Sequence, residues 1–356
     1  MKFTITADAL ADAAGFAAKG ISARPANPIL SGLLIEAVPT GLRISGFDYE
    51  KSARTQVAAE VAEPGTVLLQ GKMFTDIIRK FGKKAVTVAV DGNKAKLTSG
   101  SAVFTMHAMP VPEFPPMPDL PAIAGTVDGD AFAAAVSQII GAAATDDSVA
   151  ILMNVQLVTE GDLLTMRTTD RYRLAEVEIP WKSASADLQL ILPAPWLQAT
   201  VKTLAGEASI LASESIVGIR SGNRATTTTV VDGDYPKIKT LFPDTTQTTI
   251  TVDRAELADV IGRVALVAER NTPVRISTSK GTMTVEAGTG EDAQGQESIT
   301  CEVDGEDVTV ALNPGYLAWS LSVTPAAEIK LGVQGVKPML ITGHEGLRQL
   351  LMPVRL

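Results

Sequence analysis

Glycine and lysine residues come close to two nucleotide-binding motifs. Gly65 is followed by Gly71 and Lys72, but five residues separate these glycines where a phosphate-binding loop has four. Gly288-Thr289-Gly290 begins like a dinucleotide-binding fingerprint, but Ala293 stands in place of its third glycine. We therefore expect no nucleotide cofactor, and no other cofactor is suggested by the sequence.

The remaining candidates for acid–base chemistry are two neighbouring carboxylates and one histidine. Asp146 and Asp147 are adjacent, so on a helix their side chains point in different directions, and a solvated helix end is the better interpretation. His107 lies in an alternating run that is typical of a strand surface. No Gly-x-Ser-x-Gly nucleophile elbow is present. We therefore expect a protein that is not an enzyme.

The composition limits the metal sites and the cell compartment. One cysteine, Cys301, cannot form an internal disulfide, and with only two histidines it excludes zinc sites built mainly from His and Cys. The N-terminus lacks the pattern of a signal peptide. The most apolar stretch, 131–144, is shorter than the roughly 20 residues that cross a bilayer. We expect a cytoplasmic protein with no membrane partner. No metal site is suggested by the sequence, although the count of residues does not exclude a carboxylate site for magnesium or calcium.

The chain repeats one pattern three times. A short strand, an acidic residue and an alanine-rich helix follow one another around Asp8, Asp128 and Asp253. Each aspartate is placed to satisfy free backbone N–H groups, as a helix N-cap or in the first turn. Repetition at steps of 120 and 125 residues indicates three related domains. The helices are expected at 9–19, 130–144 and 255–269.

A second strand-then-helix pattern lies deeper in each copy. Proline closes the copies at Phe114-Pro115, Tyr235-Pro236 and Met352-Pro353, where it stops a strand. Runs of period two, such as 85–90, indicate half-buried strands. The expected class is α+β, with two helices on mostly antiparallel sheets in each domain. The second helices are expected at 73–81, 196–204 and 316–321, and the domains at 1–121, 122–245 and 246–356.

Charge is unevenly distributed along the chain, whose net charge is −9. Residues 1–121 carry 13 Lys and Arg against 11 Asp and Glu, whereas the rest of the chain is acidic. Phosphate contacts need positive charge but no particular sequence, so a local basic cluster is a candidate DNA-contacting surface. A solvated helix face is the alternative interpretation. The cluster lies on and just after one short predicted helix and comprises Lys72, Arg79, Lys80, Lys83 and Lys84.

Several longer strings are specific when they occur together. They include Arg24-Pro25-Ala26-Asn27-Pro28, Gly46-Phe47-Asp48-Tyr49-Glu50, Thr169-Asp170-Arg171-Tyr172-Arg173-Leu174-Ala175 and the terminal Leu351-Met352-Pro353-Val354-Arg355-Leu356. In these positions they resemble the bacterial DNA polymerase III β subunits, the family of replication sliding clamps. The resemblance covers the whole chain, including the threefold repeat.

The resemblance implies a ring. In this family two chains join head to tail as a homodimer, and six similar domains enclose double-stranded DNA with helices lining the hole and sheets outside. Such a ring holds DNA by topology, so an acidic chain binds DNA when only its inner helices are basic. The implied role is a non-catalytic processivity subunit, located in the cytoplasm with the nucleoid.

The resemblance also implies a hydrophobic cleft between the second and third domains. It would take short motifs rich in Gln, Leu and Phe from the DNA polymerase III α subunit, the clamp loader, other polymerases and repair proteins. A preformed apolar groove with a few polar groups suits such peptides. Carried over by motif position, the cleft residues are Leu152, Thr169, Arg171, Tyr172, Arg173, Leu174, Pro236, Leu241, Asn313, Tyr316, Val336, Pro338, Met339, Met352, Pro353, Val354, Arg355 and Leu356.

DNA and dimer contacts are implied in the same way. Arg24 matches a family contact position, and Lys72 falls where the family often has a basic residue. The DNA-contacting candidates are Arg24, Lys72, Lys80, Lys83 and Lys84. The dimer interface is expected to pair the strand that carries Phe104 and Met106 with the end of the third domain's first helix, near Leu266 and Val267.

Two departures from the family keep alternatives open. No Lys or Arg occurs from 97 to 166, and Lys202 is the one cation near the second helix of the central domain. Thr240 stands where many relatives have arginine at the cleft edge. A clamp-fold paralogue, resistant to an inhibitor or dedicated to repair, is therefore a second hypothesis, and growth with this gene as the sole clamp would separate the two. An enzyme on a duplicated α+β scaffold is the third.

Overall fold

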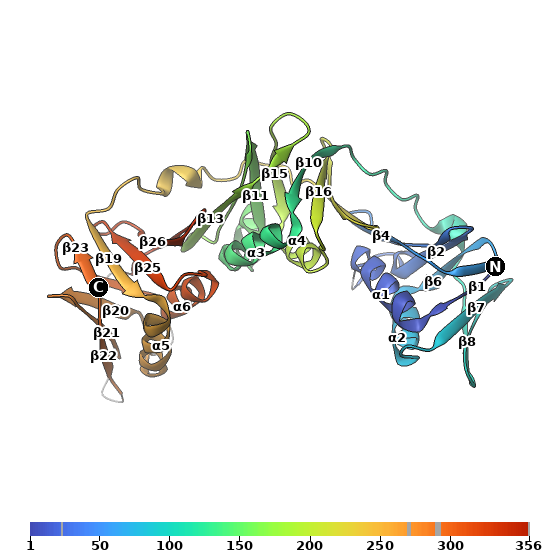
Figure 1. Ribbon diagram of the computed structural model, residues 1–356, viewed down its shortest axis with the longest axis horizontal. Helices are drawn as coiled ribbons and strands as arrows, with labels where there is room; N and C mark the ends of the chain where they lie inside the picture. The colour runs from blue at the N-terminus through green and yellow to red at the C-terminus, as the bar shows by residue number, and fades with distance from the viewer. Residues whose placement is uncertain (23, 269–271, 289–292, 355–356) are drawn as a thin grey trace. The chain divides into compact units, whose positions relative to one another are not determined.

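The computed structural model describes residues 1–22, 24–268, 272–288 and 293–354, and its helices and strands are drawn in Figure 1. The described residues group into two compact units. Unit 1 comprises Met1–Asp130, Lys182–Ala186 and Ala199–Val230. Unit 2 comprises Ala131–Trp181, Asp187–Gln198 and Val231–Leu356. The central third of the chain thus contributes to both units. The boundaries given above for the three domains stay predictions.

Unit 1 combines two helices with two antiparallel sheets. The helices are α1 (Ala7–Ala17) and α2 (Gly71–Lys80). The smaller sheet has the order β5-β1-β7-β8-β9, with bounds Glu60–Glu63, Lys2–Thr6, Ala85–Asp91, Lys94–Ser99 and Ala102–His107. The larger sheet has the order β14-β10-β16-β17-β18-β4-β3-β2-β6, with bounds Lys182–Ser183, Ile123–Asp128, Glu207–Ala212, Ile216–Ser221, Arg224–Thr229, Lys51–Val57, Gly41–Phe47, Gly32–Val38 and Gly65–Gln70.

The larger sheet of unit 1 is continuous between distant parts of the chain. β18 pairs with β4 in antiparallel register from Arg224 opposite Thr55 to Thr228 opposite Lys51. The buried hydroxyl groups of Ser52 and Thr227 form a hydrogen bond of 2.7 Å across this pair. The first and central thirds of the sequence therefore share one sheet, and the helices α1 and α2 pack on a core that includes Phe3, Leu10, Phe74 and Ile78.

Unit 2 also combines helices with two antiparallel sheets. Its larger sheet has the order β15-β11-β12-β13-β27-β26-β25-β19-β23, with bounds Gln189–Pro193, Asn154–Glu160, Leu163–Thr169, Arg173–Pro180, Leu347–Leu351, Met339–His344, Glu328–Val333, Thr248–Asp253 and Glu302–Asp304. Its smaller sheet has the order β22-β21-β20-β24, with bounds Gly295–Thr300, Thr282–Ala287, Val274–Ser279 and Thr309–Leu312. The helices are α3 (Gly129–Ile139), α5 (Arg254–Val264), α6 (Pro314–Val323) and α4 (Ala194–Val201), whose last residues are assigned to unit 1.

The predicted repeat is confirmed, down to the short turn that follows the first helix of each copy. The helices α1, α3 and α5 each have 11 residues and are each followed by a three-residue 3₁₀ turn. These turns are Ala18–Gly20, Ile140–Ala142 and Ala265–Val267. Asp253 is the N-cap of α5, and its carboxylate accepts a hydrogen bond from the Glu256 N–H at 2.8 Å. Asp8 lies in the first turn of α1, as expected for an acidic residue at a helix N-terminus.

Glycine allows one helix end to pack directly on a sheet. A Cβ atom on Gly20 would lie 2.4 Å from the carbonyl oxygen of Gly46 in β3 and 2.5 Å from the nitrogen of Ala53 in β4. Both contacts are with backbone, so a larger residue would push the turn after α1 away from the sheet. Among the described residues, the helices are too short or too polar to cross a membrane.

Candidate functional site

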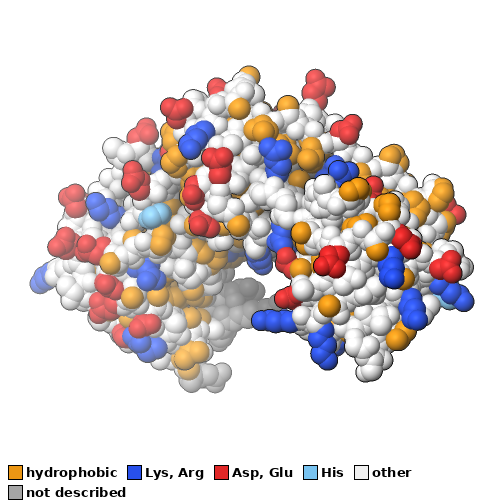
Figure 2. Space-filling view, turned by 45° about the vertical axis from the view of Figure 1, so that its right-hand side comes forward, with side chains coloured by type: hydrophobic (Ala, Val, Ile, Leu, Met, Phe, Trp, Pro, Cys, Tyr) orange, Lys and Arg blue, Asp and Glu red, His pale blue; other side chains and the backbone are white. Residues whose placement is uncertain are grey.

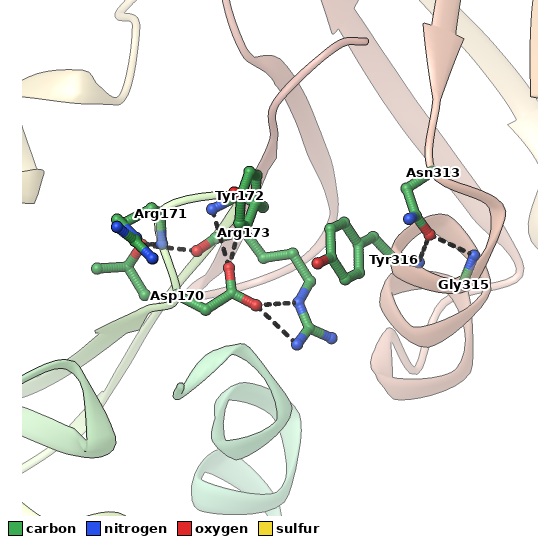
Figure 3. Close-up of polar contacts among 8 residues, drawn as sticks. Asp170, Arg171, Tyr172, Arg173, Asn313, Gly315 and Tyr316 are labelled. Atoms are coloured by element: carbon green, nitrogen blue, oxygen red, sulfur yellow. Dashed lines mark hydrogen bonds and ion pairs between the residues drawn. The ribbon is translucent and has the colours of Figure 1, made fainter. Parts of the chain in front are cut away.

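A tight turn between β12 and β13 organises the best-defined candidate site (Figure 3). Arg171 at its centre has a φ angle of 79°, a left-handed conformation that most residues avoid. The Thr169 hydroxyl donates to the carbonyl oxygen of Arg173 at 2.7 Å and accepts from the Arg171 N–H at 3.0 Å. Asp170 accepts from the N–H groups of Tyr172 at 2.9 Å and Arg173 at 2.7 Å. Four hydrogen bonds therefore fix the directions of the side chains that follow.

The Arg173 side chain is held between two elements. Its Nε and Nη2 atoms lie 2.9 and 2.8 Å from Oδ2 of Asp170. Its Cζ atom lies 4.4 Å from the ring centre of Tyr316 and 5.0 Å from that of Trp319, both on α6. Cation–π contacts of this kind add attraction between the guanidinium and the rings. Burial and then the charge of Asp170 raise the pKa of the Tyr316 hydroxyl above its ordinary value of 10.0.

A side-chain cap sets the start of α6. Oδ1 of Asn313 accepts hydrogen bonds from the N–H groups of Gly315 at 2.9 Å and Tyr316 at 3.2 Å (Figure 3). The cap satisfies free N–H groups at the helix start, and Pro314 follows it in the first helical position. Tyr316 is thereby presented to the turn, where its ring stacks on Tyr172 at 6.2 Å between centres.

These side chains line a cavity in unit 2. Its volume is about 290 Å³, and its wall includes the predicted residues Leu152, Arg171, Tyr172, Arg173 and Tyr316. Leu152 is buried, whereas Tyr172 is 54% exposed. The rest of the wall comes from Asp170 and from the segment after α3, namely Ala143, Ala144, Thr145, Asp146, Ser148 and Val149. The structure therefore brings five of the predicted cleft residues together around one hollow.

A second group of apolar residues lies under Leu174. The buried members are Leu174, Ile191, Tyr235, Ile238, Phe242 and Leu350. Pro236 and Leu241, the predicted residues on the same segment, are exposed. Of these six, Leu174 is the one that was predicted from the sequence. The sequence reasoning missed Ile191, Tyr235, Ile238, Phe242 and Leu350. The apolar spacing of Ile238, Leu241 and Phe242 around the short 3₁₀ helix Ile238–Leu241 was the available signal.

The end of the described chain docks on this region. The Met352 N–H donates to the carbonyl oxygen of Tyr172 at 2.9 Å, and the Val354 N–H donates to that of Ala311 at 2.8 Å. Met352 and Val354 nevertheless remain 40% and 39% exposed. The main chain is therefore fixed while apolar side chains stay accessible. Pro353 lies between them, and the predicted residues Arg355 and Leu356 fall outside the described residues.

The other predicted cleft residues lie where the chain enters β26. Met339, its first residue, is buried and stands opposite Leu351 of β27. Pro338 is half-buried, and Val336 is 92% exposed in the preceding turn. Met339 is thus a core residue, and Val336 is the accessible apolar side chain of this segment.

The predicted DNA-contacting residues lie in unit 1. Lys72 and Lys80 are on α2, Lys83 and Lys84 follow it, and all four are exposed. Nζ of Lys72 lies 2.9 Å from Asp76 one turn along the helix. Arg24 is exposed in the loop after α1. On the face drawn in Figure 2, basic side chains are interspersed with acidic ones.

The predicted dimer residues differ in accessibility. β9 is an edge strand of unit 1, on which Phe104 is 44% exposed and Val103, which the sequence reasoning did not select, is 53% exposed. Met106 is 4% exposed and packs in the unit 1 core, although it lies two residues from Phe104 and therefore on the same side of the strand. In unit 2, Leu266 is 83% exposed and Val267 packs partly against the core.

Comparison with known proteins covers the whole chain. Residues 1–118, 126–237 and 239–355 match the family models of the N-terminal, central and C-terminal domains of the DNA polymerase III beta subunit. The chain is 46% identical to a beta sliding clamp of Micrococcus luteus, across 85% of this chain and 100% of that protein. It is 40% identical to the beta sliding clamp of Streptomyces coelicolor across 100% of both. The DNA polymerase sliding clamp of Bacillus subtilis is a structural neighbour with a TM-score of 0.95 and 26% identity, covering 100% of this chain and 99% of that chain.

Proposed function

The chain belongs to the DNA polymerase III beta subunit family, the bacterial sliding clamps, and from this membership we propose that it serves as a replication clamp. It has the three-domain clamp fold of helices on antiparallel sheets, and it is a processivity factor without catalytic chemistry of its own. In the proposed role two chains form a head-to-tail ring around duplex DNA in the cytoplasm. The ring tethers the polymerase to its template.

The proposed partner site is inferred from the surface around the turn at residues 169–173. Leu174 and the buried residues beneath it form an apolar floor, and exposed Leu241, Met352 and Val354 lie on segments connected to it. The polar groups that could orient a peptide are the Arg173 guanidinium and the backbone of the turn, and Asp170 holds both in place. A preformed apolar surface with few oriented polar groups binds a short peptide at low entropic cost. Its proposed ligands are Gln-, Leu- and Phe-containing motifs of the polymerase α subunit, the clamp loader, other polymerases and repair proteins.

The ring itself rests on surface features of each unit. Exposed Val103 and Phe104 lie on the free edge of β9, and edge strands with apolar side chains favour pairing with another chain. Exposed Leu266 in unit 2 is the proposed counterpart on the second chain. Because each contact joins different surfaces, two of them close a ring of two chains. DNA contact is proposed for the lysines at and after α2, which need only meet phosphates.

The test is peptide binding with and without the C-terminal segment. A fluorescently labelled Gln-Leu-Asp-Leu-Phe peptide is titrated with the full chain and with a chain that lacks residues 352–356, and fluorescence anisotropy is recorded. Truncation leaves Leu351 opposite Arg173 in the sheet, so the fold is retained while the exposed Met352 and Val354 are removed. We expect saturable binding by the full chain and a loss of at least about tenfold on truncation.

The control is the same peptide with Ala in place of both Leu residues and Phe. Equal binding of the two peptides, or equal binding by the full and truncated chains, would contradict the proposed cleft. Size-exclusion chromatography with light scattering, run on the same samples, reports whether the dimer survives truncation as the assignment requires.

A further inference from the structure

Gly141 lies in the 3₁₀ turn that follows α3, two residues before Ala143, which lines the cavity in unit 2. A Cβ atom on Gly141 would lie 2.2 Å from Nε1 of Trp319, 2.7 Å from its Cε2 and 2.9 Å from its Cδ1. Carbon atoms cannot approach a ring this closely, so even an alanine would force the packing to shift. The edge of the Trp319 indole therefore occupies the space that a side chain at residue 141 would need.

The backbone at Gly141 does not itself require glycine. Its φ angle is not positive, so other residues adopt the same conformation. The matching position in the other two copies of the repeat is the second residue of the turn after the first helix, and it holds Lys19 and Leu266. Both have long side chains. The missing side chain is thus particular to the central copy, and the indole of Trp319 accounts for it.

Trp319 connects this turn to the Arg173 guanidinium. It lies three residues after Tyr316 on α6, so the two rings share one face of the helix. Cζ of Arg173 lies 4.4 Å from the ring centre of Tyr316 and 5.0 Å from that of Trp319. The Asp170 carboxylate pairs with the same guanidinium, whose side chain is 15% exposed (Figure 3). A displaced indole would therefore displace the cation that the partner site presents.

We propose that Gly141 is a positioning residue of the partner site, because its missing side chain makes room for the indole that supports Arg173. This role rests on the proposed function, since it concerns the binding of a peptide. Gly141 acts without touching the peptide, through Trp319 and then Arg173. The N–H groups of a guanidinium form directional, charge-assisted hydrogen bonds, so a small displacement weakens them.

Two movements would accommodate a methyl group at residue 141. In the first, the indole of Trp319 moves and leaves the guanidinium. In the second, the turn moves away from α6 and shifts Ala143 and Ala144 in the cavity wall. Trp319 is half-buried, and a close-packed surrounding leaves neither movement free of cost. Only the first movement depends on the ring at residue 319, and the test uses this difference.

The test is a double-mutant cycle in the full chain. Gly141→Ala adds the methyl group, and Trp319→Leu removes Nε1 and Cε2, the two ring atoms nearest to it. Gly262→Ala is the matched control, because Gly262 lies within α5 without a positive φ angle and its Cβ atom would meet no described residue beyond its own helix within 4 Å. Affinity for the labelled Gln-Leu-Asp-Leu-Phe peptide is measured by anisotropy, and stability by urea denaturation.

The expected result is a loss of affinity that depends on the indole. Gly141→Ala should weaken peptide binding by about tenfold, the effect of losing one hydrogen bond to a charged group, whereas Gly262→Ala should change it by less than about twofold. Trp319→Leu alone should also weaken binding, because the guanidinium loses a cation–π contact. In the Trp319→Leu background, Gly141→Ala should cause no further loss.

Two results would overturn the role of Gly141. Equal affinities of the Gly141→Ala and Gly262→Ala chains would show that residue 141 does not position the site. An equal loss from Gly141→Ala with and without Trp319→Leu would show that the effect passes through the cavity wall instead. Lower stability alone does not imitate the expected result, because a chain that is still folded without urea keeps its affinity unless the site itself has changed.

Failure of the proposed function gives a different result. In that case the unsubstituted chain does not bind the peptide, and the urea cycle decides whether Gly141 holds Trp319 in place. Gly141→Ala should then lower the urea midpoint in the unsubstituted chain but not in the Trp319→Leu background. Equal lowering in both backgrounds would contradict the contact.

Discussion

At the scale of single residues, Asp170 is the hub of the candidate partner site. One of its oxygens accepts two backbone N–H groups of the turn, and the other holds the Arg173 guanidinium. Its side chain is 12% exposed, so water replaces these bonds poorly. The same carboxylate therefore fixes the backbone of the turn and orients the Arg173 guanidinium.

The two roles of Asp170 are separable by substitution. Asp170→Ala removes both sets of bonds, and we expect the free energy of unfolding to fall by about 2–3 kcal/mol and peptide binding to disappear. Asp170→Asn keeps an oxygen for the N–H groups but loses the charge that holds Arg173. We expect this variant to retain most of the stability while its peptide affinity falls several-fold. Urea denaturation and anisotropy measure the two effects, and equal stability of the Ala variant and the unsubstituted chain would contradict the role of the turn.

The hydroxyl of Tyr235, beneath the partner site, makes the stability of the fold depend on alkaline pH. Its buried hydroxyl donates to the carbonyl oxygen of Asn154 at 3.2 Å, and burial raises the pKa of this hydroxyl above the ordinary value of 10.0. The folded chain thus binds this proton more tightly than the unfolded chain. The stabilisation is complete below pH 10.0 and is lost as the pH rises through the folded-state pKa.

Tyr235→Phe is the corresponding experiment. At neutral pH the variant loses one buried hydrogen bond, and we expect its free energy of unfolding to be lower by about 1 kcal/mol. Above pH 10.0 the unsubstituted chain should lose stability more steeply than the variant, so the gap narrows. Urea denaturation at several pH values measures it. A gap that stays constant into the alkaline range would show that the hydroxyl does not titrate differently in the folded chain.

At the scale of elements, three strands of unit 2 are joined by one buried carboxylate. Arg167 of β12 stands opposite Glu176 of β13, which stands opposite Arg348 of β27. Glu176 has no exposed surface and forms ion pairs with both arginines. Since β27 directly precedes the docked C-terminal segment, this row of side chains fixes the strand from which that segment starts.

Removing the central charge leaves two arginines without their partner. We expect Glu176→Gln to lower the free energy of unfolding by about 3–5 kcal/mol, because unpaired buried charge is costly. Glu178→Gln is the matched control, since Glu178 lies two residues along the same strand but is exposed, and it should change stability by less than about 0.5 kcal/mol. Denaturant unfolding measures both. Similar effects of the two substitutions would mean that this row of charged side chains contributes little to the free energy of unfolding.

Prediction from sequence succeeded where the signal is local. The threefold pattern around Asp8, Asp128 and Asp253 located α1, α3 and α5, because capping residues and apolar periodicity lie within one segment. The pairings of β18 with β4 and β13 with β27 were not predictable, because they join strands over 160 residues apart with no turn to set the register.

The candidate site was likewise predictable only where its residues form a local pattern in the sequence. The string from Thr169 to Leu174 was recognisable, and the structure explains it as a turn held by its own side chains. Ile238, Phe242 and Leu350 were missed because an apolar residue in the sequence does not show which core it joins.

At the scale of the whole molecule, DNA contact depends on where the few accessible cations lie. The chain carries a net charge of −9, so long-range attraction to DNA is weak or unfavourable. Exposed Lys80, Lys83 and Lys84 instead form a local basic group at the end of α2. In the proposed ring this group meets phosphates regardless of sequence, and its effect falls with added salt because counterions are released.

Reversing these charges tests that placement. We expect the chain with Lys80, Lys83 and Lys84 changed to Glu to dissociate faster from nicked circular DNA than the unsubstituted chain, with the difference largest at low salt. The matched control changes Lys96, Lys182 and Lys330 to Glu, three exposed lysines on strands rather than at a helix end. Both variants have the same net charge, so a general electrostatic effect would alter them equally. Faster loss of the α2 variant alone assigns these lysines to the DNA face, whereas equal retention of both variants removes them from it.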